Sequence, residues 1–317
     1  MLPFVLSALI ACGTVALILF SAYVTYLLAF HRSKKPLDIE RELGIKIDGY
    51  KEALLAAEAL EAFPSEEVTL LSHDGLKLVG RYYHFSDGAP LDILFHGYKS
   101  TPFHDFAAGV KLPYCEHNLL LVYQRAHGKS GGRSITFGAK ERLDVKTWCD
   151  YAYERFGANI PITLRGVSMG AATLLFASEL QLAPSVKCMV ADCPYSSVRD
   201  IIMNTMKRRH LPASLLYPLV RLGAIIYAGF DPSKYSTIDA VRNSRLPIIL
   251  IHGECDTFVP CAMSAEIYAA HGGRMDYHTF PSAEHGTSYL VDTERYMRVT
   301  LAFVAEFVYN QKIEDDQ

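Results

Sequence analysis

Ser168 lies in the segment GVSMGA, residues 166–171, between two glycines and directly after the apolar run PITLR. A serine hydroxyl in such a turn can attack a carbonyl carbon once a base removes its proton. The pentapeptide G-x-S-x-G is weak evidence by itself, because it occurs by chance in roughly one chain in ten of this length. The alternative interpretation is a serine that caps the following helix. The flanking segments and the partner residues therefore have to decide between a nucleophile and a helix cap.

His285 is the favoured base among the 12 histidines of the chain. It lies in the loop PSAEHG, after the predicted last strand and before the predicted last helix. His252 is the competing histidine, but it ends the apolar run PIILI. We expect the loop that follows His252 to hold its ring in place.

Asp256 is the favoured carboxylate to orient that base. It lies at the end of IHGECD, after a buried run and before a predicted helix start, so the alternative is an Asp that only caps the helix. Glu254 and Asp192 are the reserve candidates, since Asp192 follows the apolar run KCMVA. The chain order Ser168, Asp256, His285 is the order of a hydrolytic triad on a strand–turn–helix scaffold.

Two backbone N–H groups would have to hold the negative oxygen that such an attack creates, in an oxyanion hole. One is expected from Met169, which follows Ser168 at a helix start, where N–H groups point toward an anion. The other is expected from Tyr98, which follows the apolar run LDILF and the pair His96-Gly97. Gly97 would let the backbone approach closely, and the Tyr98 side chain is expected only to pack.

These residues follow short apolar runs that alternate with helical patterns. The runs predict strands at residues 68–71, 76–85, 91–95, 119–123, 162–166, 188–191, 248–251 and 275–280, the first two joined by the turn SHDG. Helical spacing predicts helices at residues 140–156, 171–180, 259–270 and 293–309. This alternation predicts an α/β fold with a mostly parallel central sheet flanked by helices. In such a sheet, the side chains that follow the strands gather at one edge.

The segments LFHGY, YQRAHGKSGG, GVSMGA, HGECDTFVP and EHG resemble the α/β-hydrolase superfamily. Within it they resemble the YqkD-like group of serine hydrolases, which is related to the serine-aminopeptidase-like hydrolases. The resemblance covers about residues 68–309 and implies an α/β-hydrolase domain, placed at residues 67–311. Ala126 is a departure, because relatives often carry glycine there in an R-G-H-G-x-S loop. We expect that loop to keep its role in shaping the top of the sheet.

The resemblance also implies an inserted helical cap at about residues 196–245, between the strand that ends at Asp192 and the strand that starts at Pro247. This segment is long and rich in apolar residues. A cap over the site would exclude water and offer an acyl-binding surface. Ordinary core packing is the alternative for any one of its residues. A membrane-facing lid is a further alternative and would suit a lipid-derived substrate.

The N-terminal run from Leu2 to Phe30 contains no charged side chain in 29 residues. Such a run is long enough to span a bilayer with some tilt, which predicts a single-pass transmembrane anchor at residues 1–30. A cleaved signal peptide would have a basic start and a shorter apolar region. The stretch LIAC, which ends at Cys12, resembles a lipid-attachment signal, but the apolar run continues well past it. Basic residues follow the span, at Arg32, Lys34 and Lys35, which predicts a cytoplasmic hydrolase domain.

Residues 31–66 are expected to form a juxtamembrane helical segment. Its second half, KEALLAAEALEAF at residues 51–63, consists of good helix formers. Helical spacing places one apolar face on this helix, and we expect that face to pack on the main domain. The residues assigned to it are Leu55, Ala59, Ala62 and Phe63. The alternative is a solvated connector helix.

Composition narrows the function further. The net charge of −3 gives no basic excess, so no nucleic-acid partner is expected. The seven cysteines are odd in number and contain no C-x-x-C pair, which favours reduced, mostly buried thiols over disulfides or a zinc site. Cys193 and Cys255 flank candidate carboxylates and are expected to be small buried packing residues.

The sequence thus predicts a membrane-anchored serine hydrolase that cleaves an ester, thioester or amide through an acyl-enzyme. The expected substrate is a small-molecule or lipid-derived acyl compound, and no metal or organic cofactor is implied. An acyltransferase with the same triad and a non-catalytic binding protein on the same fold are the alternatives. A peptidase is disfavoured, because the cap shows no clear acidic pair for a free amino terminus.

Overall fold

Eight apolar runs form one central sheet in the computed structural model, which describes residues 1–32, 38–43, 46, 48–106 and 117–309. Lys34, Lys35 and Cys115 lie outside the described residues. The strands are β1 (Glu66–Leu71), β2 (Lys77–Tyr83), β3 (Leu91–Phe95), β4 (Asn118–Tyr123), β5 (Ile162–Val167), β6 (Val186–Asp192), β7 (Ile248–Gly253) and β8 (Met275–Phe280). Their order is β1-β2-β4-β3-β5-β6-β7-β8. The first two pairings are antiparallel and the others are parallel, so the predicted mostly parallel α/β sheet is confirmed.

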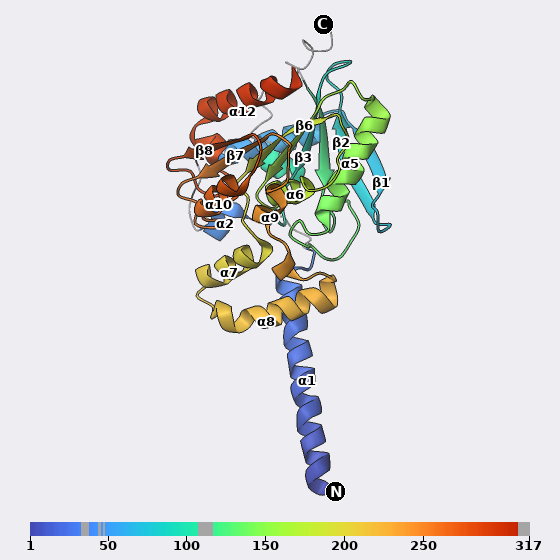
Figure 1. Cartoon of the computed structure of the whole chain (residues 1–317), viewed down its shortest axis with the longest axis vertical. Helices are drawn as coiled ribbons and strands as arrows, with labels where there is room; N and C mark the ends of the chain where they lie inside the picture. Colours follow the sequence, from blue (N-terminus) through green and yellow to red (C-terminus); the bar gives the residue numbers. More distant parts are fainter. Residues whose placement is uncertain (33–37, 44–45, 47, 107–116, 310–317) are drawn as a thin grey trace.

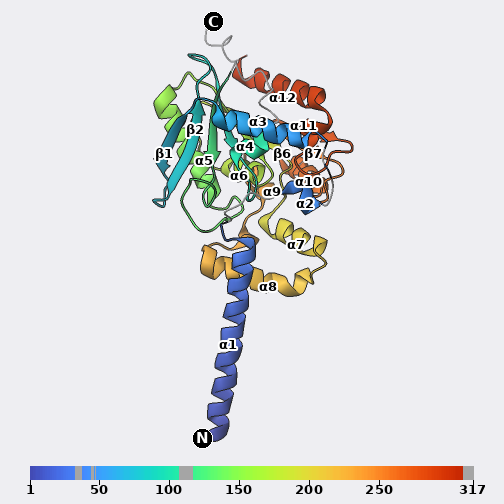
Figure 2. The same cartoon turned by 180° about the vertical axis from the view of Figure 1, so that it is seen from behind.

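Helices cover both faces of this sheet (Figure 1, Figure 2). In the main domain they are α3 (Tyr50–Ala62), α4 (Pro102–Phe106), α5 (Glu141–Phe156), α6 (Met169–Ala177), α10 (Ala262–Ala270), α11 (Ser288–Val291) and α12 (Thr293–Val308), with the short α2 (Ile39–Leu43) before them. Neighbouring strand residues point to opposite faces. Leu120 therefore packs with Trp148 of α5, whereas Leu121 packs with Leu60 of α3. The core is thus two apolar layers separated by the sheet.

The helix predicted at residues 51–63 forms as α3, but the face assigned to it is wrong. Leu55 and Phe63 are 58% and 49% exposed, and Ala59 and Ala62 are also exposed. The buried residues of α3 are instead Ala57 and Leu60, which pack on the sheet. Phe63 is the C-cap with extended backbone, so its side chain does not continue the helical stripe.

A helical segment lies between β6 and β7, where the cap was predicted. It contains α7 (Val198–Arg208), α8 (Ala213–Gly223), a π-helix (Ala224–Ala228), a 3₁₀ turn (Pro232–Lys234) and α9 (Thr237–Val241). Figure 1 shows α7 and α8 below the sheet, with α8 crossing the upper part of the N-terminal helix. The exact limits of the anchor, juxtamembrane and hydrolase segments stay predictions.

The N-terminal helix α1 (Leu2–Ala29) is long and apolar enough to cross a bilayer. It projects from the domain in both views (Figure 1, Figure 2). Only its last part contacts the domain, through Ala22, Tyr26 and the following Phe30, all of which are buried. The Phe30 ring meets Phe137 and Phe230 edge-on, with ring centroids 5.8 and 5.5 Å apart. The end of α1 is therefore part of the folded domain and not a free tether.

Replacing Phe30 with alanine is expected to destabilise the domain by about 3 to 5 kcal/mol, the usual cost of removing a fully buried phenylalanine. Thermal unfolding of the whole chain in detergent would measure the effect. Phe20→Ala is the matched control, because Phe20 lies on the same helix and is 64% exposed. Equal melting temperatures for the two variants would contradict a structural role for the end of α1.

Candidate active site

Ser168 occupies a sharp turn between β5 and α6. Its backbone has φ 54° and ψ −115°, a left-handed conformation that is costly for a residue with a side chain. The flanking glycines permit the turn: a Cβ on Gly166 would lie 2.6 Å from the nitrogen of Ala171, and one on Gly170 would lie 1.9 Å from the carbonyl oxygen of Phe95. A serine that only caps a helix needs neither this strained backbone nor these close contacts.

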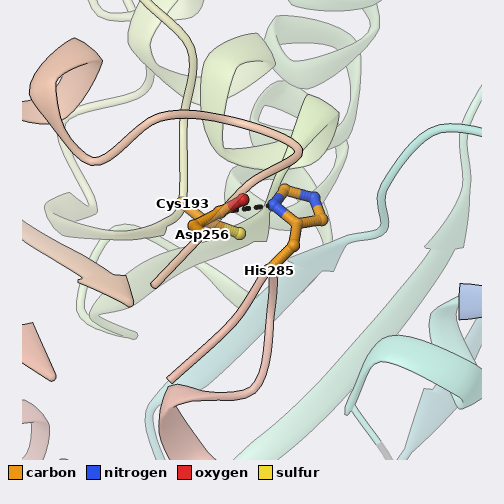
Figure 3. Close-up of side chains that lie close together, drawn as sticks. All are labelled: Cys193, Asp256 and His285. Carbon is orange, nitrogen blue, oxygen red and sulfur yellow. Dashed lines mark hydrogen bonds and ion pairs between the residues drawn. The ribbon is translucent and has the colours of Figure 1, made fainter. Parts of the chain in front are cut away.

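His285 lies between Ser168 and Asp256. Its Nε2 is 2.9 Å from Ser168 Oγ and its Nδ1 is 2.7 Å from Asp256 Oδ2. Figure 3 shows the imidazole directed at the Asp256 carboxylate. This pattern assigns the proton to Nδ1, so that Nε2 accepts from the serine hydroxyl. All three residues are buried, with 8% exposure or less.

Electrostatics favour a charged Asp256 and a readily protonated His285. Burial alone would raise the pKa of Asp256, but the imidazoles of His285 and His252 hold that pKa well below its usual range. Burial alone would lower the pKa of His285, but the negative charge of Asp256 raises it above the ordinary 6.5. Asp256 Oδ1 also accepts the N–H groups of Phe258 and Val259, at 2.9 and 2.7 Å. Asp256 therefore caps the following turn and orients the histidine at the same time.

Neither reserve candidate is hydrogen-bonded to His285 among the described residues. Glu254 is exposed and accepts a hydrogen bond from Thr279 at 2.6 Å. Asp192 is buried, which raises its pKa to about 6, and it makes no hydrogen bond to His285 among the described residues. His252 is held as expected, with Nδ1 2.6 Å from Ser264 Oγ and Nε2 2.8 Å from the Val259 carbonyl. His252 Nε2 is also 3.2 Å from Asp256, a contact that the sequence did not suggest.

The loop after β3 brings Gly97, the residue before Tyr98, close to Ser168. A Cβ on Gly97 would lie 3.4 Å from the Cβ of Ser168. The N–H of Gly97 is used by Asp105 at 2.5 Å and the N–H of Lys99 by His127 at 3.0 Å. The N–H groups of Tyr98 and of Met169 have no acceptor among the described residues. Neither N–H is thus taken by another acceptor in the described part of the chain, and their role as oxyanion donors stays a prediction.

Asp105 is a site residue that the sequence reasoning missed. It lies in the five-residue helix α4 and is partly buried, and the loss of solvent around its carboxylate raises its pKa. Its carboxylate accepts from the Gly97 N–H and from the Ser100 hydroxyl, so it fixes the loop that carries the Tyr98 N–H. The sequence signals for α4 are Thr101, whose hydroxyl accepts the His104 N–H at 3.1 Å, and Pro102 at the first helical position. A helix this short has no periodicity.

The Tyr98 side chain does more than pack. Its ring stacks on Phe137 with centroids 5.0 Å apart, and its hydroxyl donates to the Ala29 carbonyl at 2.8 Å. Lys99 Nζ donates to the Leu28 carbonyl at 3.2 Å. The last carbonyls of α1 are thus bound by side chains of the loop that contains Tyr98 and Lys99.

The loop that contains Ala126 keeps its place on top of the sheet. Ala126 has φ 60°, the left-handed region that favours glycine, which gives a physical reason for the glycine expected there. Arg125 next to it bonds Asp144 at 2.7 and 2.6 Å and Asp74 at 3.0 Å. His127 then holds the N–H of Lys99. The loop thus keeps its conformation with Ala126 in place of glycine, and through His127 it holds the segment beside Ser168.

Cys193 lies beside the Asp256–His285 pair, and the ligand atoms of all three fall within 4.8 Å of one another (Figure 3). Burial raises the pKa of the Cys193 thiol well above its usual range, so it stays protonated and is a poor metal ligand. The Asp256 carboxylate already forms a hydrogen bond with His285. Cys193 is a buried packing residue as expected, whereas Cys255 is exposed, so the same prediction for Cys255 is wrong.

Comparison with known proteins agrees with this architecture. YqkD of Bacillus subtilis (strain 168), an uncharacterised protein, is 22% identical over 188 residues, which span 59% of this chain and 62% of YqkD. The match thus covers less than two thirds of that relative. No protein-family model matches the chain.

Solved structures give broader matches. The Pyrococcus furiosus esterase Pf2001 superposes with a TM-score of 0.66 at 25% identity, over 79% of this chain and 94% of the esterase. The α/β-hydrolase GrgF from Penicillium sp. sh18 has a TM-score of 0.59 at 16% identity, over 78% and 99% of the two chains. An acylaminoacyl peptidase of Pyrococcus horikoshii has a TM-score of 0.57 at 16% identity, over 79% and 43%. The last two show the fold alone. The chain therefore has the α/β-hydrolase fold, the esterase match supports a hydrolase, and the match to YqkD fits the group to which the motifs point.

Proposed function

We propose that this protein is a membrane-anchored serine hydrolase that cleaves carboxylic esters with an apolar acyl group. The observation that carries the proposal is the hydrogen-bonded series from Ser168 Oγ through His285 to Asp256, with distances of 2.9 and 2.7 Å. A serine with this partner is a nucleophile at neutral pH, because the imidazole takes its proton as the hydroxyl attacks. Thioesters and amides are accessible to the same chemistry.

The reaction has two halves. Ser168 Oγ forms a bond to the carbonyl carbon while its proton moves to His285 Nε2, and the N–H groups of Tyr98 and Met169 bind the resulting oxyanion. Collapse of this intermediate expels the alcohol, which receives the proton from His285. Water then attacks the acyl-enzyme with the same histidine as base, which releases the acid and restores the serine. Asp256 stabilises the imidazolium in both halves and does not itself take the proton.

The apolar surroundings of the serine favour an apolar acyl group. One buried cluster includes Met169 next to Ser168, Ile202 and Val220 of the cap, and Phe30 at the end of α1, with Tyr98 packed against it. We propose that the acyl chain on the serine lies against these apolar side chains and is shielded from water. Each added methylene would then stabilise the bound acyl group further. This favours a lipid-derived substrate.

The apolar helix α1 supports a membrane anchor. Residues 1–20 are all exposed, and a helix that presents apolar side chains on every side suits lipid. We retain the predicted cytoplasmic side for the hydrolase domain, which rests on the basic residues after the span. Of these, Arg32 donates to the Gly128 carbonyl at 2.5 Å.

A chain-length series of p-nitrophenyl esters, from acetate to dodecanoate, tests the proposal. The whole chain in detergent is used, because removal of α1 would also remove Phe30 and the Ala29 carbonyl from the domain. We expect kcat/KM to rise with acyl length, by up to about fourfold per methylene, since a buried methylene contributes about 0.8 kcal/mol. Preference for acetate would contradict the apolar acyl site. Faster product release with an added alcohol, together with a new ester product, would identify an acyltransferase instead.

A further inference from the structure

The segment after α7 presents an apolar stripe to the outside. Leu211, Leu215, Ile225 and Ile226 are 44%, 74%, 43% and 46% exposed. Pro218 is exposed and Leu222 partly exposed, and spacings of three and four residues place Leu215, Pro218 and Leu222 on one side of α8. Leu211 lies just before this helix, and Ile225 and Ile226 lie in the π-helix that follows it. We name these six residues the α8 outer face. The opposite side, with Ala213, Val220 and Ala224, packs into the cap. A contiguous exposed apolar patch marks a surface that contacts a membrane or another protein.

The second observation is that α8 crosses α1 at close range. A Cβ on Gly223 would lie 2.3 Å from the carbonyl oxygen of Ala22, so only glycine permits this approach. Thr25 Oγ1 donates to the Leu219 carbonyl at 3.2 Å. Figure 1 shows α8 running across the axis of α1, just below the main domain. The α8 outer face therefore adjoins the exposed part of α1.

The position of the crossing matches the thickness of a bilayer. The part of α1 that precedes it runs from Leu2 to Ser21, and at 1.5 Å per residue it measures about 30 Å, which equals the hydrocarbon core of a typical membrane. Tyr23 and Tyr227 meet at the crossing with ring centroids 5.1 Å apart. Tyrosines are enriched at the level of lipid headgroups. The length and the aromatic pair both place the crossing at the membrane surface.

We infer that the α8 outer face lies in the interfacial layer of a lipid bilayer, so that the cap is a second membrane contact beside the anchor. The inference rests on the proposed membrane anchor and extends it. The loops that carry Tyr98 and Phe137 contact the end of α1, so the edge of the sheet that holds Ser168 faces the same surface. A membrane-resident ester thus reaches the site from the bilayer, without crossing bulk water.

Tryptophan quenching by lipid tests this placement. Ile225→Trp and, separately, Leu215→Trp are introduced into the whole chain, which is reconstituted into phosphatidylcholine vesicles with brominated acyl chains. Leu301→Trp on α12 is the matched control, because Leu301 is 38% and Ile225 is 43% exposed. The native Trp148 is 1% exposed and gives the same background in all three variants. Flotation of the vesicles measures membrane anchoring independently.

We expect both cap tryptophans to be quenched several-fold more than the one at position 301, with emission shifted to shorter wavelength. Equal quenching at the three positions, or none at positions 215 and 225 in protein that floats with the vesicles, would overturn the inference while the anchor stands. Protein that fails to float would overturn the anchor, and the inference with it. Hydrolysis of a soluble ester by the same samples shows separately whether the proposed chemistry holds.

Discussion

Replacing Ser168 with alanine is expected to lower kcat/KM for ester hydrolysis by about 10⁴-fold or more, the usual effect of removing the nucleophile of a triad. The expected loss is this large because no other hydroxyl in the described part of the chain is bonded to His285. The residual rate would come from the oxyanion donors alone. A p-nitrophenyl ester assay measures the loss, and covalent labelling by a fluorophosphonate probe measures the nucleophile directly.

Ser178→Ala is the matched control for this variant. Ser178 lies at the other end of α6, is 7% exposed where Ser168 is 8%, and donates only to the Leu175 carbonyl. It should label and hydrolyse like the unchanged protein. Equal labelling of the Ser168→Ala protein would show that another residue reacts, and no labelling of the unchanged protein would favour a non-catalytic role for the fold.

Replacing Asp256 with asparagine is expected to lower kcat by about 10⁴-fold, because the amide no longer fixes the tautomer of His285 or stabilises its positive charge. The pH profile gives a second readout. The raised pKa of His285 places the acid limb of kcat/KM above pH 6.5 in the unchanged protein, since the base must be neutral. Loss of the negative charge at position 256 lowers that pKa, so the acid limb of the variant moves to lower pH.

Asp192→Asn separates this role from the effect of any buried carboxylate. Asp192 is buried like Asp256, but it does not bond His285 among the described residues, so kcat/KM should stay near the unchanged value. A large loss of kcat/KM in Asp192→Asn, together with a small loss in Asp256→Asn, would show that the orienting acid is Asp192 at the end of β6. An unmoved acid limb in Asp256→Asn would also contradict the assignment.

The strands and the hydrogen-bonded trio were predictable because local signals determine them. Runs of four to ten residues with apolar or extended patterns, most of which end in glycine or polar residues, mark the strands, and Ser168, Asp256 and His285 each come shortly after such a run. Once the sheet is parallel, the side chains at the strand ends must gather at one edge. The chemistry of the site therefore follows from element order without knowledge of packing.

Contacts between distant segments were not predictable in the same way. The α3 face was wrong because an Ala- and Leu-rich helix has more than one apolar side, and only the sheet beneath selects Ala57 and Leu60. Asp105 lies in a helix too short to show a pattern. The bond from Tyr98 to Ala29 joins residues that no motif connects. These features depend on tertiary structure, which a local pattern does not encode.

The contact of Phe30 with Phe230 has a consequence for how the protein is made. The two rings belong to residues 200 positions apart, so α1 leaves the ribosome long before its partners exist. In the anchored form proposed above, α1 is already inserted when Phe137 and then Phe230 are synthesised. The hydrolase domain thus closes onto a helix that is fixed in place, and this non-local contact forms late. Newly made chains therefore complete the packing around Phe30 only after nascent synthesis has passed Phe230 in the cap.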